Sequence, residues 1–209
     1  MNLRAPTSIA VFALTLGLGA LTGCAAESTV GEASALDDTA VDVASDALVT
    51  TGDLPNVFTV RPGVMRGGRP SVAGYIKLKA LGIKTIIDLE TADLVEANQA
   101  AIDSDRANAT AAGMRWVHIP MQAFTTGLSA RFDAKVNQAL AVLKNHGRGG
   151  VYLHCKHGRD RTGLVMALDR VENEGWAADR AYDEMIARGF RTYFVGMKSY
   201  FERRTGYDD

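Results

Sequence analysis

The chain has 209 residues, of which 47% are hydrophobic, and its formal net charge is −1. This composition supports a folded core and excludes a fully disordered chain, and the length leaves room for one ordinary domain with additional segments. With only two cysteines and four histidines, the sequence shows neither a disulfide framework nor a cluster of metal-ligand residues, so no metal is expected.

The first residues have the features of an export signal. One positive charge at Arg4 precedes an apolar run over residues 9–21, which is too short to span a bilayer comfortably. The run ends in Leu-Thr-Gly-Cys24, which resembles the lipobox of bacterial lipoproteins, in which the cysteine is lipidated and becomes the new N-terminus. The alternative is an ordinary signal peptide in which Cys24 has no role.

We therefore expect a lipoprotein signal peptide over residues 1–23 and a lipid anchor on Cys24 that holds the protein at a membrane. Ala25 after the cysteine resembles outer-membrane sorting, so the expected location is the outer membrane, facing the periplasm or the cell surface.

Residues 24–54 contain no aromatic residue and are rich in Ala, Ser, Thr, Asp and Val. Such a segment cannot bury enough apolar surface to fold, so it is predicted to be a flexible acidic tether. Residues 55–209 then hold 22 basic and 17 acidic residues, a net charge of +5. A basic domain favours anionic ligands, and no nucleic-acid partner is expected.

From residue 55 onward, short apolar runs alternate with amphipathic stretches. Strands are predicted at 57–60, 64–66, 83–89, 114–120 and 150–154, and a glycine turn at 67–70. Helices are predicted from Ser71, as the cap, to Leu81, over 93–112, from Ser129 to His146, and over most of 162–204. This alternation predicts a single α/β domain over 55–209, with a central, mostly parallel sheet flanked by helices.

The stretch HCKHGRDRTG, residues 154–163, lies between a predicted strand and an apolar helix. A helix N-terminus offers free amides and a positive dipole to an anion, and Gly158 lets the loop curl so that its N–H groups point inward. Further positive charge is expected from the side chains of His154, Lys156, His157 and Arg159. This field favours the thiolate form of Cys155.

Two further residues, at the end of this stretch, complete the expected site. Arg161 can offer a planar fork to two oxygens of a tetrahedral anion, and Thr162 can place a hydroxyl near the sulfur. The loop therefore predicts a phosphate site with the thiolate of Cys155 beneath the phosphate.

The pattern His-Cys-x5-Arg-Thr-Gly resembles the phosphate-binding loop of the protein tyrosine phosphatase superfamily. GVMRGGRPS and LKALGIKTIIDL resemble the entry segment of bacterial and fungal dual-specificity-like phosphatases, which read approximately YRSGQPS and LGIKTIINLR. TGLVMALDRVENEGWAADRAYDEM resembles their helices after the loop, and the resemblance covers most of residues 56–195. It implies a dual-specificity phosphatase-like fold.

The resemblance also implies residue roles. Cys155 matches the nucleophile, Arg161 the phosphate clamp, and the backbone of residues 156–161 the phosphate cradle. Cys155 would attack phosphorus to form a phosphocysteine intermediate, which water then hydrolyses. Because Arg161 and the amides neutralise the charge of the transferred group, the reaction implies no metal and no cofactor.

The general acid departs from the family pattern. Family members carry an Asp on a mobile loop before the cysteine, whereas Gln122 stands there in this chain and cannot donate a proton. Asp160 is one candidate, because myotubularin-like and some bacterial lipid phosphatases have Asp at that position, but it can instead pair with a basic residue and hold the loop. Asp133 is the other, although a first-turn helix charge is its simpler explanation.

The basic loop side chains Lys156, His157 and Arg159 resemble those of inositide and inositol polyphosphate phosphatases, including exported phytases of the tyrosine phosphatase type. Inositol polyphosphates are therefore the first expected substrates, and phosphoproteins, acted on by a tyrosine or dual-specificity phosphatase, are the second. A phosphate-binding pseudophosphatase and a sulfur-transfer or arsenate-reducing enzyme are the alternatives. Arg66 and Arg69 are expected either to support the loop or to contact the substrate.

Overall fold

The computed structural model describes residues 52–92, 98–123, 130–147 and 149–208. The predicted signal peptide, Cys24 and all but the last three residues of the predicted tether lie outside these ranges. Within them, no helix combines the length and the apolar character that crossing a membrane requires.

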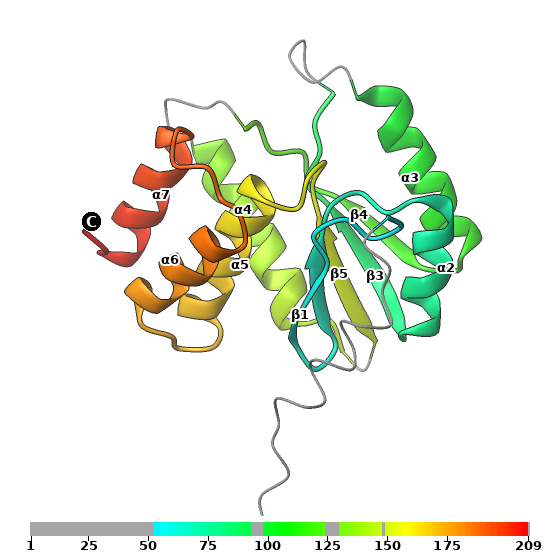
Figure 1. Cartoon of the computed structure of the whole chain (residues 1–209), viewed down its shortest axis with the longest axis horizontal. Coiled ribbons are helices and arrows are strands. Elements are labelled where there is room, and N and C mark those ends of the chain that lie inside the picture. Colours follow the sequence, from blue (N-terminus) through cyan, green and yellow to red (C-terminus); the bar gives the residue numbers. More distant parts are fainter. Residues whose placement is uncertain (1–51, 93–97, 124–129, 148, 209) are drawn as a thin grey trace, which may run out of the picture. The chain divides into compact units, whose positions relative to one another are not determined.

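A five-stranded sheet forms the centre of the domain (Figure 1). In chain order its strands are β1 (Phe58–Arg61), β2 (Val64–Gly67), β3 (Ile83–Asp88), β4 (Arg115–His118) and β5 (Gly150–His154). Their spatial order is β1-β2-β5-β3-β4, with β1 antiparallel to β2 and all other neighbouring pairs parallel. The predicted mostly parallel sheet is confirmed, and the strand bounds differ from the prediction by at most two residues.

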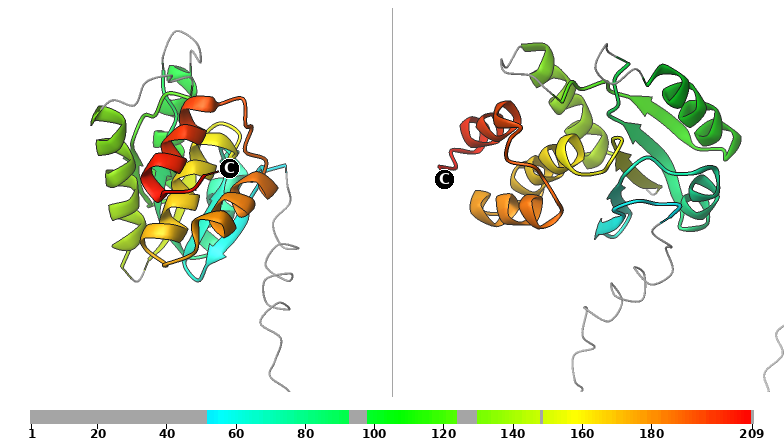
Figure 2. Two further views of the ribbon diagram at one scale, coloured as in Figure 1. Left: turned by 90° about the vertical axis from the view of Figure 1, so that its left-hand side faces the viewer. Right: turned by 45° about the horizontal axis from the view of Figure 1, so that its top comes forward.

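Helices cover both faces of the sheet, as the sequence predicts (Figures 1 and 2). One face carries α2 (Val72–Ala80) and α3 (Gln99–Ala111), and the other carries α4 (Ala130–Lys144), α5 (Asp160–Glu172), α6 (Ala178–Ala187) and α7 (Val195–Thr205). Each face has its own apolar cluster. Ile86 and Tyr152 belong to the cluster under α2 and α3, whereas Ile87 and Leu153 belong to the larger cluster on the other face. The alternation along β3 and β5 follows from the two-residue period of a strand.

The ends of two helices bear on the site. Ser71 caps α2, as predicted, because its side chain accepts a hydrogen bond of 3.1 Å from the amide of Gly74. The start of α5 differs from the prediction: the helix begins at Asp160, two residues earlier than expected. Asp160 and Arg161 therefore lie in the first helical turn rather than in the loop.

The folded contacts begin before residue 55. Leu54, predicted to belong to the tether, is fully buried in the cluster under α2 and α3. Asp53 accepts hydrogen bonds from both the hydroxyl and the amide of Ser71, at 2.6 and 2.9 Å. Asp53 makes these contacts with Ser71, which is 18 residues away in sequence. Composition alone does not record such contacts and places the end of the tether two residues too late.

Candidate active site

The loop 155–159 connects the carboxyl end of β5 to the start of α5 (Figure 1). Cys155 is 2% exposed, while its loop neighbours Lys156, His157 and Arg159 are exposed. The cap residue Arg159 makes no side-chain hydrogen bond to the helix. The structure thus places a helix N-terminus beside a buried sulfur, with the exposed Lys156 and Arg159 in the same loop.

Gly158 is required by the path of the loop. Its φ is +69°, and a Cβ at this position would lie 2.2 Å from the carbonyl carbon of Gly67, so a larger residue would collide with the turn after β2. The carbonyl of Gly158 accepts hydrogen bonds from Asn56 Nδ2 at 2.9 Å and Arg66 Nη2 at 2.6 Å. The carbonyl of Lys156 accepts a hydrogen bond from the Arg69 amide at 3.3 Å. In a trans peptide the N–H points opposite to the carbonyl, so the amides of His157 and Arg159 are directed away from this segment, to the side where an anion can be bound.

Arg66 supports the loop through a buried hydrogen bond to the carbonyl of Gly158. It comes from β2, is 1% exposed and reaches Gly158 across the parallel pair of β2 and β5. Burial lowers the pKa of Arg66 to about 10, with the thiol of Cys155 acting in the opposite direction, so the guanidinium stays charged at neutral pH. Arg66 is therefore a positioning residue that also places a positive charge under the loop.

Arg69 takes no part in the loop through its side chain. Its guanidinium forms a forked pair with the buried carboxylate of Glu90 and lies 3.3 Å from Asp105. Of the two arginines in this turn, the structure assigns loop support to Arg66 and a buried charge pair to Arg69.

Arg161 and Thr162 are both buried at the start of α5. Arg161 Nη1 donates to the carbonyls of Leu89 at 3.4 Å and Met121 at 3.2 Å, which follow β3 and β4. These contacts fix the guanidinium at the carboxyl edge of the sheet, beside the loop, as a phosphate clamp requires. The hydroxyl of Thr162 is fully buried and has no hydrogen-bond partner among the described residues.

His154 at the end of β5 and His157 in the loop do not add the positive charge that the sequence predicts. Burial lowers the pKa of His154, so this imidazole is neutral at neutral pH. Partial burial and then the charges of Lys156, Arg191 and Arg159 lower the pKa of His157. The cations at the site are therefore the lysine and the arginines. A bound anion would raise the pKa of His157 by offsetting its neighbours.

Asp160 has the geometry of a structural residue rather than of a general acid. Both of its oxygens accept hydrogen bonds from the guanidinium of Arg191, at 2.6–3.2 Å, and one also accepts from the Arg191 amide at 3.1 Å. A general acid needs an oxygen directed at the leaving group, whereas both oxygens of Asp160 are directed at Arg191. The pair ties the start of α5 to the segment between α6 and α7.

Asp133 and Gln122 are the other two positions that the sequence analysis considered for the general acid. Asp133 lies in the first turn of α4, is 58% exposed, and accepts a hydrogen bond from the Tyr200 hydroxyl of α7. This contact braces two helices, in agreement with the simpler explanation for Asp133. Gln122 is exposed in the segment after β4, next to residues 124–129, which lie outside the described ranges.

Asp160→Asn is expected to weaken the site as a whole. Loss of the charged pair with Arg191 should cost about 1–3 kcal/mol and lower Tm by about 2–10 °C. Hydrolysis of para-nitrophenyl phosphate and of an alkyl phosphate should fall by the same factor, and Arg191→Gln should reproduce both effects. Asp179→Asn, on the exposed start of α6, is the matched control. A defect confined to the alkyl phosphate would instead make Asp160 the general acid, because only an alkyl leaving group needs the proton.

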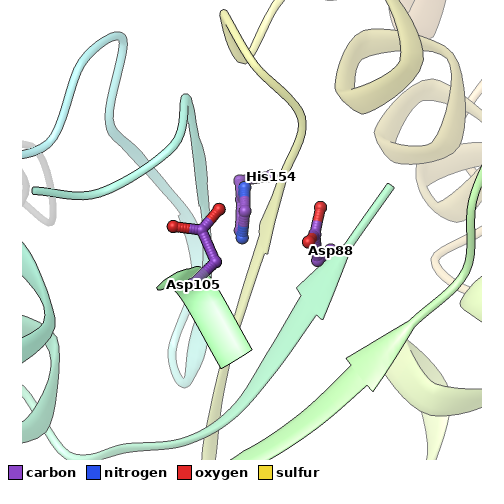
Figure 3. A group of neighbouring side chains, drawn as sticks. All are labelled: Asp88, Asp105 and His154. Carbon is purple, nitrogen blue, oxygen red and sulfur yellow. The ribbon is translucent and has the colours of Figure 1, made fainter. Parts of the chain in front are cut away.

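Sequence reasoning missed several residues that the structure brings to the site. Asn56 holds the loop at Gly158 and Arg191 holds Asp160, from positions 102 and 31 residues away. Arg66, 92 residues from Gly158, is instead a residue for which loop support was one of the two expected roles. Behind the loop, Asp88 and Asp105 lie beside His154 (Figure 3). The only sequence signal for this group is an aspartate at the end of an apolar strand and another on the apolar face of a helix.

Residues 55–193 match the family described as "DSP-PTPase phosphatase fused to NAD+ Kinase". The dual specificity protein phosphatase TpbA of Pseudomonas aeruginosa is 32% identical over 136 residues, which are 65% of this chain and 55% of the relative. The inositol diphosphatase DSP2 of Arabidopsis thaliana is 26% identical over 156 residues, covering 62% of this chain and 60% of that protein. The chain thus spans little more than half the length of these relatives.

The solved structure of P. aeruginosa TpbA superposes with a TM-score of 0.58 at 27% identity and covers 77% of this chain and 89% of that one. A complex of TpbA with pTyr gives a TM-score of 0.57 at the same identity, covering 73% and 85% of the two chains.

Proposed function

Because the chain belongs to the family of dual-specificity-type protein tyrosine phosphatases, we propose that it hydrolyses phosphomonoesters through Cys155 and acts on inositol polyphosphates or related polyanionic phosphates. Its residues 55–193 form a cysteine-dependent phosphatase domain of this family. In the proposed reaction Cys155 attacks phosphorus and the alkoxide leaves. Water then cleaves the sulfur–phosphorus bond and releases phosphate. Arg161 and the loop amides stabilise the charge of the transferred group.

The preference for polyanions is supported by one observation, the positive charge exposed at the mouth of the loop. Lys156 and Arg159 are exposed beside His157, whose pKa is lowered by partial burial and then by the cations around it. The carboxylate in this loop region, Asp160, is already paired with Arg191. A substrate with several phosphates can use this charge, whereas a single phosphotyrosine uses only the buried cradle.

Phosphoprotein hydrolysis is the second candidate. It is favoured by the buried position of Cys155, which suits a phosphate carried on a long aromatic side chain, and by the pTyr bound to the related TpbA. Both candidate functions use the same cysteine chemistry. Their substrates differ in the groups that lie outside the phosphate cradle.

Kinetic assays on a panel of substrates distinguish the two candidate functions. The expected result is a kcat/KM for inositol hexakisphosphate above that for a phosphotyrosine peptide, falling steeply with added salt because the contacts outside the cradle are ionic. Lys156→Ala and Arg159→Ala should each raise KM for inositol hexakisphosphate by about tenfold, which corresponds to one charge-assisted hydrogen bond, and should leave para-nitrophenyl phosphate nearly unchanged. Lys84→Ala is the control, since Lys84 is exposed near the amino end of β3. Higher kcat/KM for the peptide would establish the second candidate.

Export and lipid anchoring at Cys24 are also part of the proposal. Their support is the sequence of residues 1–25 alone: the apolar run, the lipobox-like ending and the residue after the cysteine. An anchored enzyme of this kind would meet phosphate esters outside the cytoplasm.

A further inference from the structure

Three polar side chains converge behind the catalytic loop, on the face of the sheet covered by α2 and α3 (Figure 3). Asp88 and His154 are the last residues of β3 and β5 and are register partners in that parallel pair. Asp105 reaches them from α3, where it lies between Ile102 and Ala109 on the buried face of the helix. One possible ligand atom from each residue lies within 4.8 Å of the other two.

These three side chains are buried, and several of their polar atoms have no hydrogen-bond partner among the described residues. Asp88, Asp105 and His154 are at most 2% exposed. Among the described residues, both ring nitrogens of His154 and one oxygen of each aspartate lack a hydrogen bond. Figure 3 shows the imidazole between the two carboxylates. Buried polar atoms without partners cost free energy, so such a group in a folded protein points to a missing ligand.

The charge of the group is also unbalanced. Arg69 is the nearby cation, but its fork is directed at Glu90, and it reaches Asp105 only at 3.3 Å. The buried carboxylate of Glu90 also lies near the group, with one oxygen 4.0 Å from His154 Nδ1, and the Tyr75 hydroxyl is a neutral group beside Asp105. Among the described residues, Arg69 therefore faces three buried carboxylates, those of Asp88, Glu90 and Asp105.

We propose that Asp88, Asp105 and His154 bind one divalent metal ion, Zn²⁺ or Mn²⁺. Two carboxylate oxygens and one imidazole nitrogen form a mixed set that suits Zn²⁺ or Mn²⁺, whereas Mg²⁺ and Ca²⁺ prefer oxygen ligands alone. In a tetrahedral site with bonds of about 2.0–2.2 Å, ligand atoms lie about 3.3–3.6 Å apart, so side-chain shifts of about 0.8 Å or less close the site.

The ion would have a structural role. His154 precedes Cys155 directly, but the two residues face opposite sides of the sheet, since Cys155 belongs to the larger apolar cluster on the α4–α7 face. A metal on His154 would fix the end of β5, from which the loop begins, and would take no part in phosphoryl transfer. This role is independent of the substrate.

The test measures metal binding to the full chain carrying Cys24→Ser and Cys155→Ser, so that no thiol competes for the ion. After removal of metal with a chelator, the protein is dialysed against Zn²⁺ or Mn²⁺, and bound metal is measured by mass spectrometry. We expect one equivalent of one of these ions. At a hundredfold excess over Kd, Tm should rise by about 5–10 °C. Adding Asp105→Asn should remove both effects, while Asp103→Asn, an exposed position on the same helix, should keep them.

Two outcomes would overturn the proposal. Absence of bound metal up to about 100 µM free ion would mean that the group is satisfied by a shared proton or a buried water molecule. Equal binding by the Asp105→Asn chain would place the ion elsewhere. Circular dichroism checks that this variant is folded, and Asp88→Asn replaces it if it is not.

Discussion

Cys155→Ser is expected to abolish turnover while substrate binding is retained. A serine hydroxyl at its ordinary pKa is a poor nucleophile, so kcat should fall by about 10⁴-fold or more. Binding should persist because the amide cradle, Arg161 and the supporting contacts of Gly158 do not involve the sulfur. Steady-state kinetics and calorimetric titration with inositol hexakisphosphate measure the two effects separately.

Trapping of the phosphocysteine intermediate complements the experiment with Cys155→Ser. Acid quenching of the unmodified enzyme during turnover should trap phosphate on Cys155, detectable by mass spectrometry of the peptide that contains it, and the serine variant should trap none. Cys24→Ser serves as the control for loss of a thiol, because Cys24 lies well before the domain. Turnover by Cys155→Ser within tenfold of the unmodified enzyme would refute the mechanism. Binding without turnover in the unmodified chain would instead identify a pseudophosphatase.

Arg161→Lys is expected to lower kcat by about 10²–10³-fold, the range for loss of one transition-state donor. A lysine ammonium is a point charge and cannot donate to two phosphate oxygens in the plane that a guanidinium offers. The arginine is also oriented by the carbonyls of Leu89 and Met121, which one ammonium cannot reach in the same geometry. The effect should therefore appear in kcat for every substrate, including para-nitrophenyl phosphate.

Arg170→Lys is the matched control for this change. Arg170 lies at the other end of α5, is equally buried, and pairs with Glu184 of α6. Its replacement should lower Tm and leave kcat nearly unchanged at temperatures well below the transition. If Arg161→Lys retained more than half of the activity, or if both variants lost activity together with stability, Arg161 would not be the phosphate clamp.

The sequence by itself determines the order of strands and helices, the parallel sheet and the chemistry of the loop. These features depend on signals within a few residues of one another: the short apolar runs of β3 and β5, the Ser71 cap, and a glycine and an arginine at fixed distances from Cys155. Short-range signals of this kind act through local backbone geometry, so they can be read without knowledge of the tertiary structure.

The tertiary structure alone decided what each buried charge does. Asp160 was equally compatible with an acid and with a structural pair until Arg191, 31 residues later in the chain, was found against both of its oxygens. Arg66 became a support of Gly158, and burial made His154 neutral rather than a cation at the nucleophile. Asp88 and Asp105 meet His154 only because two strands and a helix bring them together. The protonation and role of a polar side chain depend on its burial and on partners distant in sequence, and no local pattern records either of these.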